Sequence, residues 1–137
     1  MKLILILITV LLTLVTLGFG GLWFGLGLQT IEVVGGNTLP ITEAPEALAM
    51  ADNSVRFLAG VWIATGIGLF ICLRNITENA TLFSVIMGGL FLGGLGRLLS
   101  FYQLGIVDAF VIPTAIELIL PPIAIALQSA LARRSSL

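Results

Sequence analysis

Residues 80–100 read ATLFSVIMGGLFLGGLGRLLS and carry a single charge, Arg97. A helix needs about 20 predominantly apolar residues to cross the hydrocarbon core of a bilayer. This stretch meets that length, and its glycines are typical of membrane-spanning helices. It therefore predicts a membrane span, and it raises the question of why an arginine lies near the end of it.

The composition of the whole chain supports the same interpretation. Its 137 residues are 58% hydrophobic and 9% charged, whereas soluble domains carry about 25% charged residues. A net charge of −1 gives no basic surface for nucleic acid. There is one cysteine, Cys72, and no histidine, so the sequence predicts no internal disulfide, no metal site and no cofactor.

Apolar stretches predict four spans, joined by one long polar loop at residues 29–52 and by two short turns. The predicted spans cover residues 3–28, 55–73, 80–102 and 109–132. The short turns, at residues 75–79 and 103–108, connect only antiparallel neighbours. The predicted fold is all-α, with residues 1–137 forming one integral membrane domain, an antiparallel four-helix bundle. The first apolar stretch is too long for a signal peptide, so we interpret it as a retained helix.

Basic residues predict the orientation, because they concentrate on the cytoplasmic side of membrane proteins. The basic residues at the span ends that share one predicted side are Lys2, Arg74, Arg133 and Arg134. The loop at residues 29–52 lies on the other side and contains no lysine or arginine. Both termini are therefore predicted to be cytoplasmic and this loop to be outside.

The outer loop predicts a small subdomain made of a β-hairpin and a helix. Residues 30–41 read TIEVVGGNTLPI, two short β-prone runs around a Gly-Gly-Asn turn. A helix is predicted from about Glu43, leading into the second span. It has a potential bend at residues 52–54, where short polar side chains can cap a new start.

Glycine spacing suggests how the spans pack. Gly21 and Gly25 in the first span, and Gly89 and Gly93 in the third, are four residues apart. Small residues let membrane helices approach closely. We interpret these pairs as internal packing faces of the bundle, with association between copies of the chain as the alternative.

Three charged residues lie within spans at similar predicted depths. Counting from a turn centred near Gly105, Arg97 and Glu117 differ in depth by roughly 6 Å at 1.5 Å per residue, and Arg56 lies near the outer end of the second span. Intramembrane charges cost less when they pair, so we predict a polar cluster with an ionised Glu117. The predicted cluster, a candidate ligand site, comprises Asn53, Arg56, Arg97 and Glu117, with Asp52, Ser100, Thr114 and Pro121 as additional members. For each arginine, extension to the lipid headgroups is the alternative.

Two prolines follow Glu117, at positions 121 and 122. Because proline has no N–H, the carbonyls of Glu117 and Leu118 lose their usual helical donors. Free carbonyls beside a carboxylate can line a polar pocket. The alternative interpretation is that the two prolines only bend the helix.

The same residues carry a resemblance to a known family. The stretches NSVRFLAGVWIATGIGLF (53–70), GGLGRLLSFYQLG (93–105) and IELILPP (116–122) resemble a bacterial family of small four-helix integral membrane proteins defined as a domain of unknown function, with a distant likeness to DoxX-like proteins. The resemblance implies four spans in the bacterial inner membrane and a shared cluster of Asn53, Arg56, Arg97 and Glu117. It implies no activity.

Three classes of function remain. The small size of the chain and its glycine-lined faces favour an accessory or interaction protein of the membrane. Besides lipid, such a protein would contact a partner membrane protein or a second copy of itself. A binder or carrier of a small anionic or amphiphilic ligand (a lipid, quinone or carboxylate) is the alternative, because arginines in low dielectric bind such oxygens well. An enzyme is least supported. Glu117 is the only candidate base, and we assign no catalytic residue.

Overall fold

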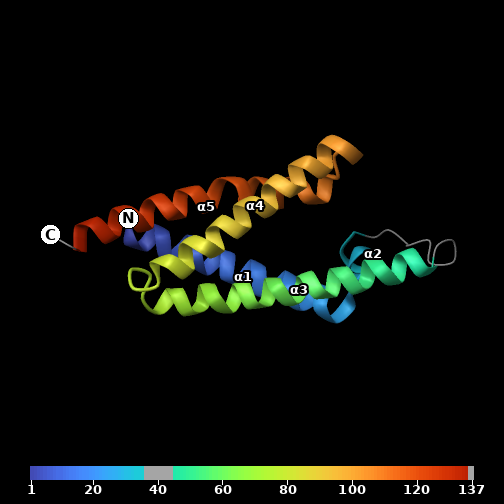
Figure 1. Cartoon of the computed structure of the whole chain (residues 1–137), viewed down its shortest axis with the longest axis horizontal. Helices are drawn as coiled ribbons and strands as arrows, with labels where there is room; N and C mark the ends of the chain where they lie inside the picture. Colours follow the sequence, from blue (N-terminus) through green and yellow to red (C-terminus); the bar gives the residue numbers. More distant parts are fainter. Residues whose placement is uncertain (36–44, 136–137) are drawn as a thin grey trace. The chain divides into compact units, whose positions relative to one another are not determined.

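A computed structural model describes residues 1–35 and 45–135 (Figure 1). These residues form helices and no strand. The helices are α1 (Lys2–Leu26), α2 (Gln29–Gly35), α3 (Pro45–Arg74), α4 (Ala80–Leu104) and α5 (Asp108–Ser135). Four of them, α1, α3, α4 and α5, are long and apolar enough to cross a membrane. The all-α class and the four predicted spans are therefore confirmed, and the chain is a multi-pass membrane protein.

The predicted hairpin is wrong in its first strand. Residues 30–34 lie in the helix α2, which follows directly on α1. The turn between them is formed by Gly27, whose φ of 57° is left-handed, and the Thr30 N–H then donates to the Gly27 carbonyl at 3.1 Å. This local turn starts a new helix, and the β-propensity of valine and isoleucine, which depends on context, is overridden. The second predicted strand lies outside the described residues.

The new helix start predicted at residues 52–54 is also wrong, because α3 continues from Pro45 to Arg74 without interruption. The short polar side chains bond within the helix instead of capping a new one. Ser54 Oγ donates to the Met50 carbonyl at 2.9 Å, and Asp52 pairs with Arg56 one turn later. The helix begins at Pro45, a residue tolerated in a first turn, and Glu43 lies outside the described residues.

The chain divides into two compact units, one made of Met1–Leu11 with Gly68–Leu137 and the other of Leu12–Ile67. In the second unit α1 packs against α3 through glycine. A Cβ built on Gly20 would lie 3.1 Å from the Ile63 nitrogen, and one on Gly66 would lie 2.8 Å from Thr16 Oγ1. Contacts this short show that the two helices approach closely only because these positions lack side chains.

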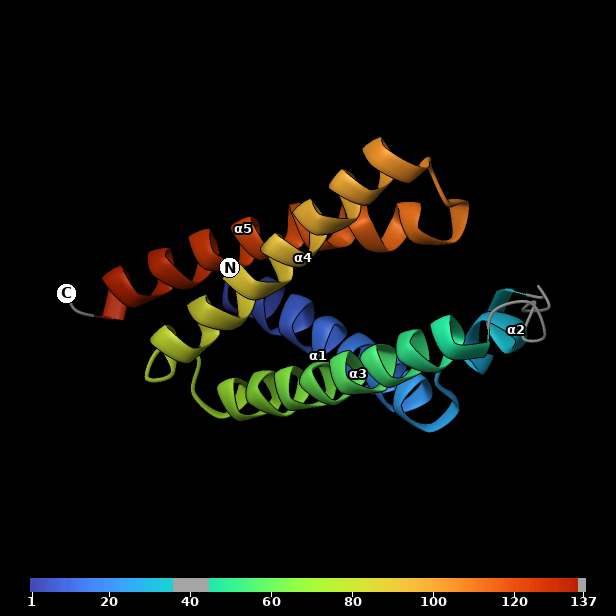
Figure 2. The ribbon, with the colours of Figure 1, turned by 45° about the vertical axis from the view of Figure 1, so that its right-hand side comes forward.

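In the first unit α4 and α5 form an antiparallel pair that lies side by side in both Figure 1 and Figure 2. Gly94 provides the close contact, since a Cβ there would lie 3.0 Å from the Cβ of Glu117. The glycine pairs predicted for internal packing make no close helix contact within the described residues. A Cβ added to Gly21, Gly25, Gly89 or Gly93 would have nothing within 4 Å. Packing instead uses the glycines one residue away, Gly20 and Gly94.

Candidate functional site: an intramembrane ion pair

Arg97 continues the buried face of α4. That face carries Phe83, Met87 and Gly94, at spacings of four and seven, and Arg97 follows three residues later. Helical positions three and four apart share a face. Arg97 is therefore placed on the same side of α4 as Gly94, the residue that touches α5.

The buried face of α5 presents the partner. Its buried residues recur at spacings of three and four: Thr114, Glu117, Pro121, Ala124 and Gln128. The helix continues through its three prolines, and Pro121 is fully buried. The Thr114 hydroxyl donates to the Phe110 carbonyl at 2.7 Å. Glu117 is the only charged member of this face.

Arg97 and Glu117 form a direct ion pair. Arg97 Nε donates to Glu117 Oε2 at 2.8 Å, with side chains 27% and 9% exposed. The ring centroid of Phe110 lies 5.0 Å from the Arg97 guanidinium carbon, within the range of a cation–π contact. The predicted contact between Arg97 and Glu117 is thus confirmed, and Phe110 is a partner that the sequence did not reveal.

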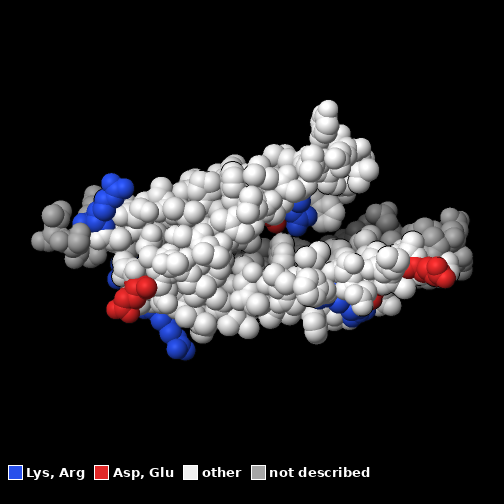
Figure 3. Space-filling model, viewed as in Figure 1, with Lys and Arg blue, Asp and Glu red and all other residues white. Residues whose placement is uncertain are grey.

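The guanidinium of Arg97 keeps unused donors. Only Nε takes part in the ion pair, and within residues 1–35 and 45–135 the two terminal Nη groups make no hydrogen bond to the chain. A guanidinium carries five N–H donors in one plane. On the face shown in Figure 3, charged side chains lie in a few separate places on a largely uncharged surface. Open donors in such apolar surroundings are the main chemical feature of this pair.

Arg56 belongs to a second ion pair, in the unit of residues 12–67. Its Nε donates to Asp52 Oδ2 at 2.7 Å, and its Nη1 donates to the carbonyls of Phe24 and Gly25 at 2.8 and 3.0 Å. Asp52 Oδ1 in turn accepts from the Leu28 N–H at 2.8 Å. We call this arrangement the α1 clip, since it caps the last carbonyls of α1, which have no helical partner.

The remaining predicted site residues have simpler surroundings. Asn53 and Ser100 are exposed, and both are without hydrogen bonds in the part of the chain that the structure describes. The sequence did suggest the Asp52–Arg56 spacing, but it gave no sign that Arg56 would bind α1 carbonyls. A glycine just after a long apolar stretch, Gly27, was the available signal for a helix end there. The joining of the two ion pairs into one cluster stays a prediction.

The family of the chain follows from comparison with known proteins. Residues 3–128 match a domain of unknown function, DUF4345. The chain belongs to this family. The DUF4345 match spans both ion pairs and confirms the resemblance to a family defined as a domain of unknown function. No curated protein and no solved structure matches the chain.

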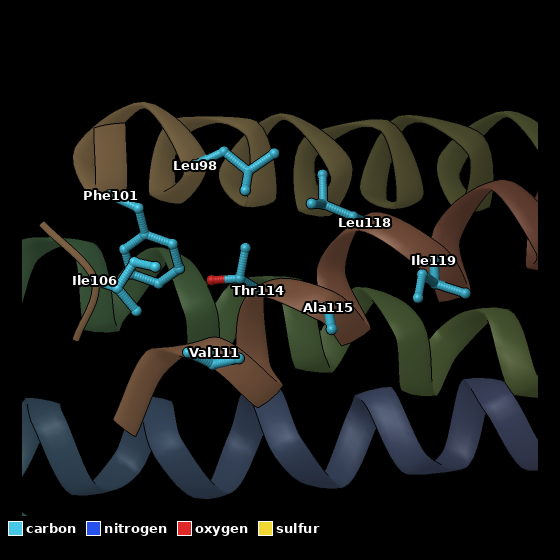
Figure 4. Close-up of a pocket in the computed structure, with 8 residues that line it drawn as sticks. All are labelled: Leu98, Phe101, Ile106, Val111, Thr114, Ala115, Leu118 and Ile119. Carbon is cyan, nitrogen blue, oxygen red and sulfur yellow. The ribbon is translucent and has the colours of Figure 1, made fainter. Parts of the chain in front are cut away.

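An apolar groove of about 380 Å³ lies between α4 and α5. Figure 4 shows its lining, with Leu98 and Phe101 from α4, Ile106 from the turn, and Val111, Thr114, Ala115, Leu118 and Ile119 from α5. Leu98 and Leu118 each follow a member of the ion pair by one residue, which is about 100° around a helix. Phe101 and Thr114, in contrast, lie one helical turn from Arg97 and Glu117, so the groove also reaches the faces of α4 and α5 that carry the ion pair. The groove offers no free polar donor, because the Thr114 hydroxyl is already bonded.

No group of three or more histidine, cysteine, aspartate or glutamate side chains gathers within the described residues as a metal site would require. The chemistry available at the candidate site is therefore that of the ion pair itself, which can donate hydrogen bonds and provide charge.

A Gly94→Ala substitution tests how closely α4 must approach the ion pair. The new Cβ would lie 3.0 Å from the Cβ of Glu117 and from Leu118 Cγ. Overpacking of this kind costs about 1 to 3 kcal/mol, and the gain in helix propensity returns up to about 1 kcal/mol. We expect a net loss of about 1 kcal/mol in the free energy of unfolding in bicelles. The matched control is Gly93→Ala, where nothing lies within 4 Å. A Gly94 variant as stable as the Gly93 variant would contradict this packing.

Proposed function

We propose that this membrane protein binds the polar head of a small amphiphile at the Arg97–Glu117 pair. The observation that supports the proposal is the state of the Arg97 side chain. Its Nε donates to Glu117 and its guanidinium carbon lies over the Phe110 ring, while its Nη donors have no acceptor among the described residues. A partly exposed group with two open donor nitrogens is suited to a ligand oxygen.

Energetics favour such a role. An arginine inside a bilayer costs up to about 2.5 to 3.5 kcal/mol on insertion scales, the most at the centre, and the ion pair with Glu117 offsets part of the cost at Arg97. Hydrogen bonds from charged donors are worth about 1.5 to 3 kcal/mol. An amphiphile is already dissolved in the membrane, so its head can supply the missing acceptor while its tail stays in lipid.

Native mass spectrometry of the protein released from a mild detergent tests this proposal. We expect the wild-type chain to retain a small-molecule adduct, because the ligand is held by charged donors in apolar surroundings. We expect the adduct to be lost from the double variant Arg97→Met with Glu117→Leu, which removes both charges and leaves no orphan charge. The mass of the adduct identifies the ligand.

The matched control is Arg74→Met, because Arg74 also lies over an aromatic ring, Phe70, at 5.9 Å but is exposed at the end of α3. Its adduct should match that of the wild type. An adduct that persists in the Arg97/Glu117 double variant would place the ligand elsewhere and contradict the proposal.

A second candidate function is an accessory or interaction protein of the membrane. One face of α4 favours it. Gly89, Gly93, Gly96 and Ser100 follow one another at spacings of four, three and four, all four are exposed, and the three glycines have nothing within 4 Å of a Cβ position. Small residues in this pattern support helix association in lipid. In the same mass spectra, multiples of the chain mass or the mass of another protein would favour this function.

The arrangement in the membrane is part of the proposal. We propose that α1, α3, α4 and α5 close into one antiparallel bundle in the bacterial inner membrane, with both termini cytoplasmic. The support is the distribution of charge, because Lys2, Arg74 and the basic residues near the end of α5 flank one predicted side.

Cysteine labelling in intact cells tests the orientation. In a Cys72→Ala background, we expect Gln103→Cys, at the exposed end of α4, to react with a membrane-impermeant maleimide. Glu78→Cys, in the turn before α4, should react only after the cells are permeabilised. Both native side chains are exposed, so access within the protein is comparable. The reverse pattern would overturn the orientation.

A further inference from the structure

The Arg97–Glu117 pair has no net charge to offer an anion. Arg97 has its own carboxylate in Glu117, as Arg56 has in Asp52. The carboxylate of Glu117 lies 2.8 Å from Arg97 Nε. A second anion on the same guanidinium would therefore approach a fixed negative charge, and like charges placed together in a binding site cost several kcal/mol.

The backbone beside the pair adds acceptors and no donors. Pro121 and Pro122 have no N–H, so the carbonyls of Glu117 and Leu118 lack the usual helical hydrogen bond. Their partial negative charges lie within one turn of the Glu117 carboxylate. The backbone of α5 just after Glu117 thus contributes negative partial charge and, at these two prolines, no N–H donor.

Phe110 restricts the direction of approach. The Arg97 guanidinium carbon lies over the Phe110 ring, 5.0 Å from its centroid, so the ring blocks approach from that side. The Nη hydrogens point outward in the plane of the guanidinium. An acceptor with lone pairs in its own plane, such as a carbonyl oxygen, meets these donors in the geometry that hydrogen bonds prefer.

We infer that the head bound at the Arg97–Glu117 pair is a neutral carbonyl group, such as that of a ketone or ester amphiphile, and is not a carboxylate or phosphate. This inference rests on the proposed function and specifies its ligand class. A neutral carbonyl accepts from the Nη donors without opposing Glu117, and the amphiphile needs no compensating cation in the membrane.

Equilibrium binding to the full chain in phosphatidylcholine nanodiscs tests the inference. The probes are hexadecan-2-one and hexadecanoate, which share a chain length and differ in the charge of the head. The Arg97→Met, Glu117→Leu double variant measures background partitioning of each probe. We expect the ketone to bind the wild type at least about tenfold more tightly than hexadecanoate, after subtraction of the background.

A Glu117→Gln variant gives a second readout. Removing the carboxylate charge should shift the ratio of the two affinities toward hexadecanoate, because the bound anion then no longer opposes Glu117. Tighter binding of hexadecanoate than of the ketone by the wild type would overturn the inference and leave the proposed function standing. If neither probe binds above background, both this inference and the proposed function are overturned. The comparison of probes in the wild type does not depend on any variant folding.

Discussion

Arg97→Ala is expected to lower the free energy of unfolding by about 3 to 5 kcal/mol, the usual cost of removing one partner of a buried ion pair. The substitution leaves the carboxylate of Glu117, whose side chain is 9% exposed, without its counter-ion inside the membrane-spanning pair α4–α5. It also removes the cation that lies against Phe110. Reversible unfolding of the bicelle-reconstituted protein by titration with sodium dodecyl sulfate measures the loss.

The control for this prediction is Arg74→Ala. Arg74 is exposed and its contact with Phe70 is longer, at 5.9 Å, so its loss should change stability by less than about 1 kcal/mol. If Arg97→Ala costs no more than Arg74→Ala, the alternative interpretation holds, in which Arg97 extends to the headgroups and Glu117 does not depend on it.

Gly27→Ala is expected to destabilise the unit of residues 12–67 by more than the roughly 1 to 2 kcal/mol that a left-handed backbone alone costs. The φ of Gly27 is 57°, which residues with a Cβ rarely adopt. The new Cβ would also collide with Asp52 Oδ1 and lie 2.7 Å from Arg56 Nη2. The substitution therefore disrupts the α1 clip as well as the turn into α2. Unfolding in the same bicelle titration provides the measurement.

Gly21→Ala is the matched control, because Gly21 lies within α1 and has nothing within 4 Å of a Cβ position. There the helix gains up to about 1 kcal/mol from the change. A Gly27 variant that is as stable as the Gly21 variant would show that neither the left-handed turn nor the clip is required.

Much of the fold could be predicted because membrane helices are specified by length and hydropathy alone. The stretch 80–102 coincides with α4 to within its last turn, since lipid leaves no alternative for an apolar segment of that length. The contact between Arg97 and Glu117 could be predicted for a related reason. Charges at similar depth in low dielectric have few partners available, so counting residues from the turn was enough to predict which two side chains would pair.

The errors arose where local contacts outweigh composition. Residues 30–34 look β-prone, but the left-handed turn at Gly27 starts α2 there. The glycine spacing was recognised, but Gly20 and Gly94 rather than their neighbours face the adjoining helix. The sequence does not reveal which of two adjacent glycines faces the neighbouring helix. That depends on the rotation of each helix about its axis, which is set by how the two whole helices fit together. Phe110 was missed for the same reason.

Arg97 and Glu117 act as a pair, and a double-mutant cycle in bicelles tests this coupling most directly, with Arg97→Met, Glu117→Leu and their combination. We predict that the double variant loses less stability than the sum of the two single variants, with a coupling of at least about 1 kcal/mol, because the combined change leaves no orphan charge. Losses of stability that simply add would show that the two residues act independently and do not form a pair.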